Sequence, residues 1–244
     1  KGDGFHLSDL QKYSSIFKSL GCICELHDLK DNISKAIDGN TKNSIDNAYV
    51  LVIRNGLDCL LKKNSKSIKE LYEQLNRFEW DRKYFDTRRQ KVLNKHARAN
   101  VCFGENGFDP DYKNKKGRVV SYNDVDCLKI IKDNIQELMG EKCSNMICEG
   151  NRYFDLKKCG IGYHGDSERR KVIAFRIGAT MNLHYNWFFK SKHIGHTHKL
   201  TLNNGDMYIM SEKAVGNDWK KKNIYTLRHA AGIEGCKYLK LKEN

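Results

Sequence analysis

The feature that most constrains the fold is a change of sequence pattern after Cys143. From there on, short segments alternate apolar and polar residues and are separated by turn residues. A period of two predicts strands with one buried face. The segments are MICEGNRYF, GIGYHGD, KVIAFRIGATMNLHY, HKLTLNNGDMYIM, IYTLRHA and CKYLKLK. Such a succession favours a double-sheet jelly roll, and NNG at 203–205 is typical of a β-hairpin turn.

The preceding part of the chain has the period of helices. Residues 7–20 carry apolar side chains at helical spacing, residues 67–80 open with a capping box, and residues 124–140 form a third amphipathic pattern. Residues 48–57 and 118–121 predict strands. We therefore expect an α+β fold with a jelly-roll core at about 143–244, helices of the N-terminal half packed on it, and a helical or loop extension at 1–45 before a domain at 46–244.

Composition narrows the partners and the compartment. The 244 residues carry a net charge of +14, which favours a polyanionic partner, most commonly nucleic acid, over a lysine-rich surface that only keeps the protein soluble. No apolar run reaches membrane-spanning length and no signal-peptide pattern is present, so we expect no membrane association. The nine irregularly spaced cysteines indicate a reducing intracellular compartment, cytoplasm or nucleus, and buried thiols rather than zinc ligands.

Residues 81–98 combine positive charge with aromatic side chains. Cations hold phosphates and aromatic rings stack on bases, so the segment is a candidate nucleic-acid surface. A helix with a solvated basic face explains the same pattern equally well. The candidate contacts are Arg82, Tyr84, Phe85, Arg88, Arg89, His96 and Arg98.

A possible metal site begins with His164 and Asp166 in GIGYHGD. Residues two apart on a strand point to the same face, so the imidazole and the carboxylate would lie side by side. His229, in YTLRHAAG near the end of the β-region, is the favoured third ligand. Two histidines and one carboxylate form the facial triad of non-haem Fe(II) oxygenases. The alternatives are a surface pair with a core histidine, and a zinc site formed by the histidines of HIGHTH at 193–198.

The order of these motifs resembles the AlkB family of Fe(II)/2-oxoglutarate dioxygenases. The resemblance covers residues 150–242 and consists of HGDSERRKVIAFRIGAT, LTLNNGDMYIM, NDWKKKNIYTLRHAAG and CKYLKLK in that order. It implies that His164, Asp166 and His229 hold the iron and that the cofactors are Fe(II), 2-oxoglutarate and O2. No comparable match covers the first 140 residues.

The resemblance also suggests residues that bind the cosubstrate. Lys237 occupies the position where the family has an Arg for the distal carboxylate, and we expect it to open the last strand and point inward with Leu239. The second family Arg would fall at Lys242 or Glu243, which departs from the pattern. Asn151 and Tyr153 correspond to an Asn and a Tyr upstream of the metal motif.

The implied activity is hydroxylation or oxidative demethylation of a nucleobase in DNA or RNA. A hydroxylase of a protein side chain is the alternative, and a binding module with an inactive oxygenase fold is a third interpretation. Arg169 and Arg170 follow the metal motif directly and would hold a substrate phosphate or carboxylate, or remain solvated. Base chemistry requires an extruded or single-stranded nucleotide.

Overall fold

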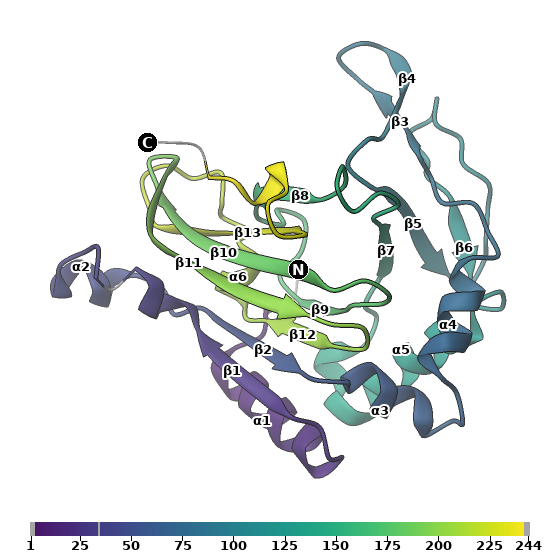
Figure 1. Ribbon diagram of the computed structural model, residues 1–244, viewed down its shortest axis with the longest axis horizontal. Helices are drawn as coiled ribbons and strands as arrows, with labels where there is room; N and C mark the ends of the chain where they lie inside the picture. The colour runs from purple at the N-terminus through teal and green to yellow at the C-terminus, as the bar shows by residue number, and fades with distance from the viewer. Residues whose placement is uncertain (1–2, 34, 242–244) are drawn as a thin grey trace. The chain divides into compact units, whose positions relative to one another are not determined.

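The computed structural model describes residues 3–33 and 35–241 and shows a mixed α+β fold (Figure 1). It contains two compact units. Unit 1 comprises the described residues of Lys1–Gly56 and Ile161–Asn244, and unit 2 comprises Leu57–Gly160. The expected boundary between residues 45 and 46 lies inside unit 1. No helix in the described ranges is long and apolar enough to cross a lipid bilayer.

Unit 1 is built on two four-stranded antiparallel sheets. The first has the order β1-β2-β12-β9 and the second the order β11-β10-β13-β8. The strands of the first are β1 (Cys24–Asp28), β2 (Tyr49–Ile53), β12 (Met207–Met210) and β9 (Val172–Phe175). Those of the second are β11 (Lys192–Leu202), β10 (Met181–Phe189), β13 (Thr226–Gly232) and β8 (Ile161–His164).

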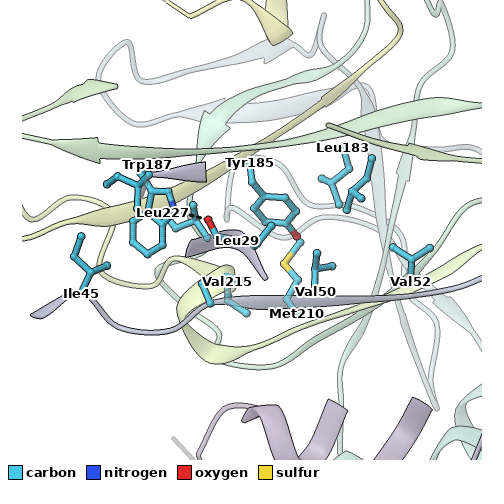
Figure 2. Close-up of a cluster of buried hydrophobic side chains, with 14 of the residues drawn as sticks. Leu29, Ile45, Val50, Val52, Leu183, Tyr185, Trp187, Met210, Val215 and Leu227 are labelled. Atoms are coloured by element: carbon cyan, nitrogen blue, oxygen red, sulfur yellow. Dashed lines mark hydrogen bonds between the residues drawn. The ribbon is translucent and has the colours of Figure 1, made fainter. Parts of the chain in front are cut away.

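The main core of unit 1 combines alternate residues of both sheets (Figure 2). β10 contributes Tyr185 and Trp187, while β2 and β12 contribute Val50 and Met210. Trp187 is fully buried, and its indole Nε1 donates a hydrogen bond to the Leu29 carbonyl at 2.8 Å. Burying an aromatic ring of this size contributes about 2–3 kcal/mol, provided that its polar atom finds a partner.

The helices of unit 1 are short apart from α1 (Leu7–Ser19), which confirms the prediction for residues 7–20. It buries Leu10, Tyr13 and Phe17 and lies next to β1 and β2. Because β1 pairs with β2, the first 45 residues are part of this unit's architecture. The remaining helical segments are η1 (Leu29–Asn32), α2 (Gly39–Ser44), α6 (Glu212–Val215) and η3 (Lys237–Leu239).

Unit 2 contains the other two predicted helices. The capping box is confirmed at α4 (Ile68–Leu75), where the Glu70 N–H donates to Ser67 Oγ at 3.2 Å and the Ser67 N–H donates to Glu70 Oε2 at 2.9 Å. α5 (Asp126–Met139) ends at Gly140 as predicted. The other helical segments are α3 (Gly56–Lys62), whose first residue belongs to unit 1, and η2 (Glu141–Cys143). The strands β3 (Lys83–Asp86) and β4 (Lys91–Asn94) form a hairpin. A three-stranded sheet of order β6-β5-β7 consists of β6 (Val119–Ser121), β5 (Ala99–Gly104) and β7 (Cys148–Arg152).

Two local expectations are wrong, and one alternative interpretation does not hold. Residues 203–205 do not close a hairpin, because β11 and β12 belong to different sheets and the turn carries the chain between them. The helix that was the alternative interpretation of residues 81–98 does not form, because this segment contains the β3–β4 hairpin. The final basic segment contains the 3-10 turn η3, not a strand, since Lys237–Leu239 pair with no strand of the described chain. Alternating apolar residues predict an extended chain but not its partners.

Candidate metal centre

The structure brings together the three side chains that the sequence singles out. His164 ends β8, Asp166 lies two residues further on, and His229 lies directly opposite His164 on the paired strand β13. His164 Nε2 is 3.7 Å from Asp166 Oδ1, and His229 Nε2 is 3.9 Å from Asp166 Oδ2. One potential ligand atom from each residue lies within 4.8 Å of the others, so a single ion could contact all three.

The turn that carries Asp166 is fixed by two glycines in close contact. A Cβ on Gly165 would lie 2.0 Å from the Gly216 carbonyl oxygen, so only glycine fits between the histidine and the aspartate. Gly216 has φ +71°, a left-handed conformation that favours glycine. The Asp166 N–H donates to the carbonyl of Val215, the last residue of α6, at 3.0 Å, which fixes the backbone of the aspartate.

The two histidines each direct Nε2 towards the carboxylate. His164 Nδ1 lies 2.8 Å from the Gly162 carbonyl, which can accept only if Nδ1 carries the proton, and this leaves Nε2 free as a ligand. Burial and the neighbouring His164 lower the pKa of His229 to about 3, so its ring is neutral at physiological pH. The Ala214 backbone opposes this shift, although no hydrogen bond of good geometry forms at His229 Nδ1.

The chemistry of this donor set fits a divalent transition metal. Neutral imidazoles and a carboxylate are suitable ligands for Fe(II), and a two-histidine, one-carboxylate set leaves coordination positions for small molecules. Within residues 3–33 and 35–241, this is the single group of three histidine, cysteine, aspartate or glutamate side chains close enough to share an ion. No cysteine of the described ranges, including neighbours in sequence such as Cys22 with Cys24 and Cys143 with Cys148, belongs to such a group.

The histidines of HIGHTH do not converge on a metal either. They lie along β11, where His196 is exposed and His198 contacts β1 instead of the other histidines. His198 Nε2 is 3.3 Å from His27 Nδ1 on β1, and His198 Nδ1 is 3.2 Å from Asn32 Oδ1. This histidine pair joins edge strands of the two sheets.

Lys237 does not have the inward orientation expected of it. Its side chain is exposed on η3, and its Nζ lies 5.1 Å from the centroid of the Tyr238 ring. Its role as a cosubstrate ligand stays a prediction. The other two proposed cosubstrate residues belong to unit 2: Asn151 lies on β7 and accepts a hydrogen bond from Arg98 Nε at 2.9 Å, and Tyr153 follows that strand.

The two arginines after the metal motif differ in their surroundings. Arg169 Nε is 4.0 Å from Asp166 Oδ2, so its charge acts on the metal centre directly. Arg170 Nη1 is 3.0 Å from Glu212 Oε1 and is paired there. The structure thus supports Arg169 rather than Arg170 as a cation near the candidate site.

The predicted nucleic-acid residues gather in and around the β3–β4 hairpin of unit 2. Arg88 and Arg89 are exposed in its turn, where the Asp86 carboxylate accepts both of their backbone N–H groups at 2.9 Å. Tyr84 on β3 is 41% exposed. Arg82 lies over the ring of Phe154 at 4.0 Å. The side chain of His96 is exposed, while those of Phe85 and Arg98 are half-buried.

Sequence reasoning missed two polar residues next to the triad. Tyr185 lies opposite His229 on β10, is only 1% exposed, and its hydroxyl has no hydrogen-bond partner among the described residues. Arg228 precedes His229 on β13 and forms no ion pair within the part of the chain that the structure describes. Alternation along β13 could have indicated that Arg228 and His229 occupy opposite faces, but the pairing with β10 was needed to find Tyr185.

Comparison with known proteins gives one informative relationship. The sequence is 46% identical over 232 residues to uncharacterized protein R156 of Acanthamoeba polyphaga mimivirus. The aligned region covers 95% of this chain and 86% of that protein. No family model matches the chain.

Proposed function

The chain belongs to the family of the mimivirus protein R156, and from its geometry we propose that it is an Fe(II)/2-oxoglutarate-dependent dioxygenase that hydroxylates or oxidatively demethylates a nucleobase in DNA or RNA. The observation that carries this proposal is the convergence of His164, Asp166 and His229 from two paired segments of one sheet. Their donor set matches that of non-haem Fe(II) oxygenases.

The strand arrangement of unit 1 supports a jelly-roll assignment. From β8 to β13, the chain visits the second sheet, the first, the second twice, the first and the second again. This exchange between two packed sheets is what a double-sheet jelly roll requires. It also places the end of β8 beside β13, so ligands distant in the sequence become neighbours.

The chain's own residues prepare the centre for a metal. His229 holds a neutral ring next to the Asp166 carboxylate, the Gly162 carbonyl orients the ring of His164, and the Gly165–Gly216 contact fixes the turn between them. When bound, Fe(II) with 2-oxoglutarate and O2 supplies oxidation of a substrate C–H bond. Buried neighbours such as Tyr185 and Leu227 keep water from the inner side of the ligands.

The buried hydroxyl of Tyr185 is our candidate contact for the cosubstrate. Its ring centroid lies 5.9 Å from that of His229, and Figure 2 shows the side chain projecting from β10 between the sheets. A buried hydroxyl without a partner costs about 1–3 kcal/mol, and a cosubstrate carboxylate would supply the missing acceptor.

Nucleic acid is the proposed substrate because positive charge and aromatic side chains occur together on an exposed element. The β3–β4 hairpin presents Arg88, Arg89 and Tyr84 to solvent, and the whole chain carries +14. Cations that contact phosphates and aromatic rings that stack on bases are the components of sequence-tolerant single-strand binding.

The proposal is tested by succinate release with a panel of methylated oligonucleotides and peptides. We expect release with an oligonucleotide, and loss of release together with loss of Mn(II) binding in His164→Ala, Asp166→Ala and His229→Ala. Release with peptides alone would establish the protein-hydroxylase alternative. Metal binding without any release would support the inactive binding module.

The Tyr185 assignment has its own test. We expect Tyr185→Phe to weaken 2-oxoglutarate binding, measured calorimetrically with Mn(II), by about tenfold. The same variant should keep or raise the melting temperature, because it removes an unsatisfied buried hydroxyl. The comparison variant is Lys237→Ala. Weaker 2-oxoglutarate binding in Lys237→Ala but not in Tyr185→Phe would assign the cosubstrate contact to Lys237 instead.

A further inference from the structure

A half-buried arginine beside the candidate metal centre forms no ion pair with any acidic group in the described ranges. Arg228 pairs with Asn186 of β10, and its side chain leaves β13 on the face opposite to that of His229. Its Nε is buried and has no hydrogen-bond partner among the described residues, an environment that disfavours the charged form. Arginine nevertheless stays protonated at neutral pH.

Two aromatic rings hold this guanidinium in place. Its central carbon lies 4.2 Å from the centroid of the Phe188 ring and 5.3 Å from that of Trp219. Contacts with ring faces stabilise a cation but leave the edge of the planar group free to donate hydrogen bonds. The arrangement therefore orients a charged donor without consuming it.

The same aromatic ring ties this group to the metal motif. Trp219 Nε1 donates to Ser167 Oγ at 3.0 Å, and Ser167 directly follows Asp166. The Trp219 N–H donates at 3.0 Å to the carbonyl of Gly216, the residue that packs against Gly165. Arg228 is thus connected to the triad in two ways. It neighbours His229 on β13, and it contacts Trp219, which is bonded to the turn after β8 that carries Asp166.

Further positive charge continues from this point onto the surface. Lys220 Nζ lies 5.6 Å from the centroid of the Trp219 ring, and Lys220, Lys221 and Lys222 are all exposed. A desolvated arginine next to an exposed lysine run suits a chain of phosphates better than a single carboxylate.

We propose that Arg228, oriented by Phe188 and Trp219, binds a backbone phosphate of a single-stranded nucleic acid next to the base being modified. Arginine donates two parallel hydrogen bonds to phosphate oxygens, which lysine cannot do. This assignment rests on the proposed function for its substrate class, but binding of the phosphate requires neither metal nor turnover.

Fluorescence anisotropy of the full chain with a labelled single-stranded oligonucleotide tests the assignment without added metal. We expect Arg228→Gln to weaken binding about tenfold and to lower the salt slope by about one, and Arg228→Lys to recover only part of the affinity. Lys18→Gln removes the same charge from an exposed position on α1 and should leave the affinity nearly unchanged.

Two further measurements separate the possible failures. Mn(II) binding to Arg228→Gln should equal that of the parent, which shows that the neighbouring His229 is intact. Unchanged oligonucleotide affinity with intact Mn(II) binding would overturn the phosphate assignment and leave the metal proposal standing. A loss confined to binding of an acidic peptide would also overturn it, in favour of a protein substrate.

Discussion

At the scale of single residues, Gly165 decides whether the three candidate metal ligands can converge, because no larger residue fits at its position. We expect Gly165→Ala to destabilise the protein by about 1–3 kcal/mol or more and to weaken Mn(II) binding, because its Cβ would lie 2.0 Å from the Gly216 carbonyl oxygen. Thermal unfolding and calorimetric titration with Mn(II) measure the two effects.

Gly162 on the preceding strand provides the matched control. A Cβ there would meet its nearest atom, the Tyr238 carbonyl oxygen, at 4.0 Å, which is ordinary contact. Gly162→Ala should therefore retain both stability and Mn(II) binding. Equal behaviour of the two alanine variants would show that the close approach of Gly165 and Gly216 does not control the site.

At the scale of elements, the β3–β4 hairpin should behave as a phosphate-binding arm. Its turn is held by backbone N–H donation to Asp86, so the arginine side chains can be removed without unfolding it. We expect Arg88→Ala with Arg89→Ala to weaken oligonucleotide binding similarly for different sequences and to lower the salt slope by about two. Anisotropy over a range of salt concentrations measures this change.

The control for the hairpin removes two charges elsewhere in unit 2. Lys113→Ala with Lys115→Ala alters an exposed loop and should change affinity much less. An unchanged affinity at low salt in the arginine double variant would exclude the hairpin as a binding surface. A lower melting temperature in Phe85→Ala would then show that this ring contributes to the hydrophobic packing of unit 2.

The contact between edge strands β1 and β11 should make stability depend on pH. Burial and the neighbouring His27 lower the pKa of His198 below the unfolded value near 6.5. Below about pH 6.5 the unfolded chain therefore takes up the proton more readily, and the free energy of unfolding falls as the pH falls. Stability from this pair is complete above that pH and is lost below it.

Substitution of His198 tests this linkage. We expect His198→Gln to reduce the loss of melting temperature between about pH 7.5 and pH 5.5, whereas His196→Gln, an exposed position on the same strand, should not. An identical pH profile in His198→Gln and the parent would contradict the assignment.

For the molecule as a whole, local patterns predicted the helices better than the sheets. The periods of α1 and α5 and the Ser67–Glu70 capping box depend on neighbours within a few residues. Sheet order depends on distant partners: β2 pairs with β12, and β11 and β12 separate into different sheets despite the turn between them. No local signal assigns residues 24–28 and 49–53 to the same sheet as β9 and β12.

For the candidate site, too, local patterns predicted some residues, while others depended on strand pairing. His164 and Asp166 follow from strand alternation, and His229 follows from its place on a short segment near the end of the β-region, a choice that the family resemblance supported. Tyr185 and Arg228 emerged only from the pairing of β10 with β13. Lys237 was misplaced because its alternating segment forms η3 instead of a final strand.

Anaerobic titration of the full chain with Fe(II) in the presence of 2-oxoglutarate tests the central claim most directly. We expect one Fe(II) per chain and a visible metal-to-cosubstrate absorbance band in the parent. Both should be lost in His164→Ala, Asp166→Ala and His229→Ala, while circular dichroism shows that each variant is folded. An absent band in the parent, or a band of unchanged strength in the three variants, would contradict an iron centre at this triad.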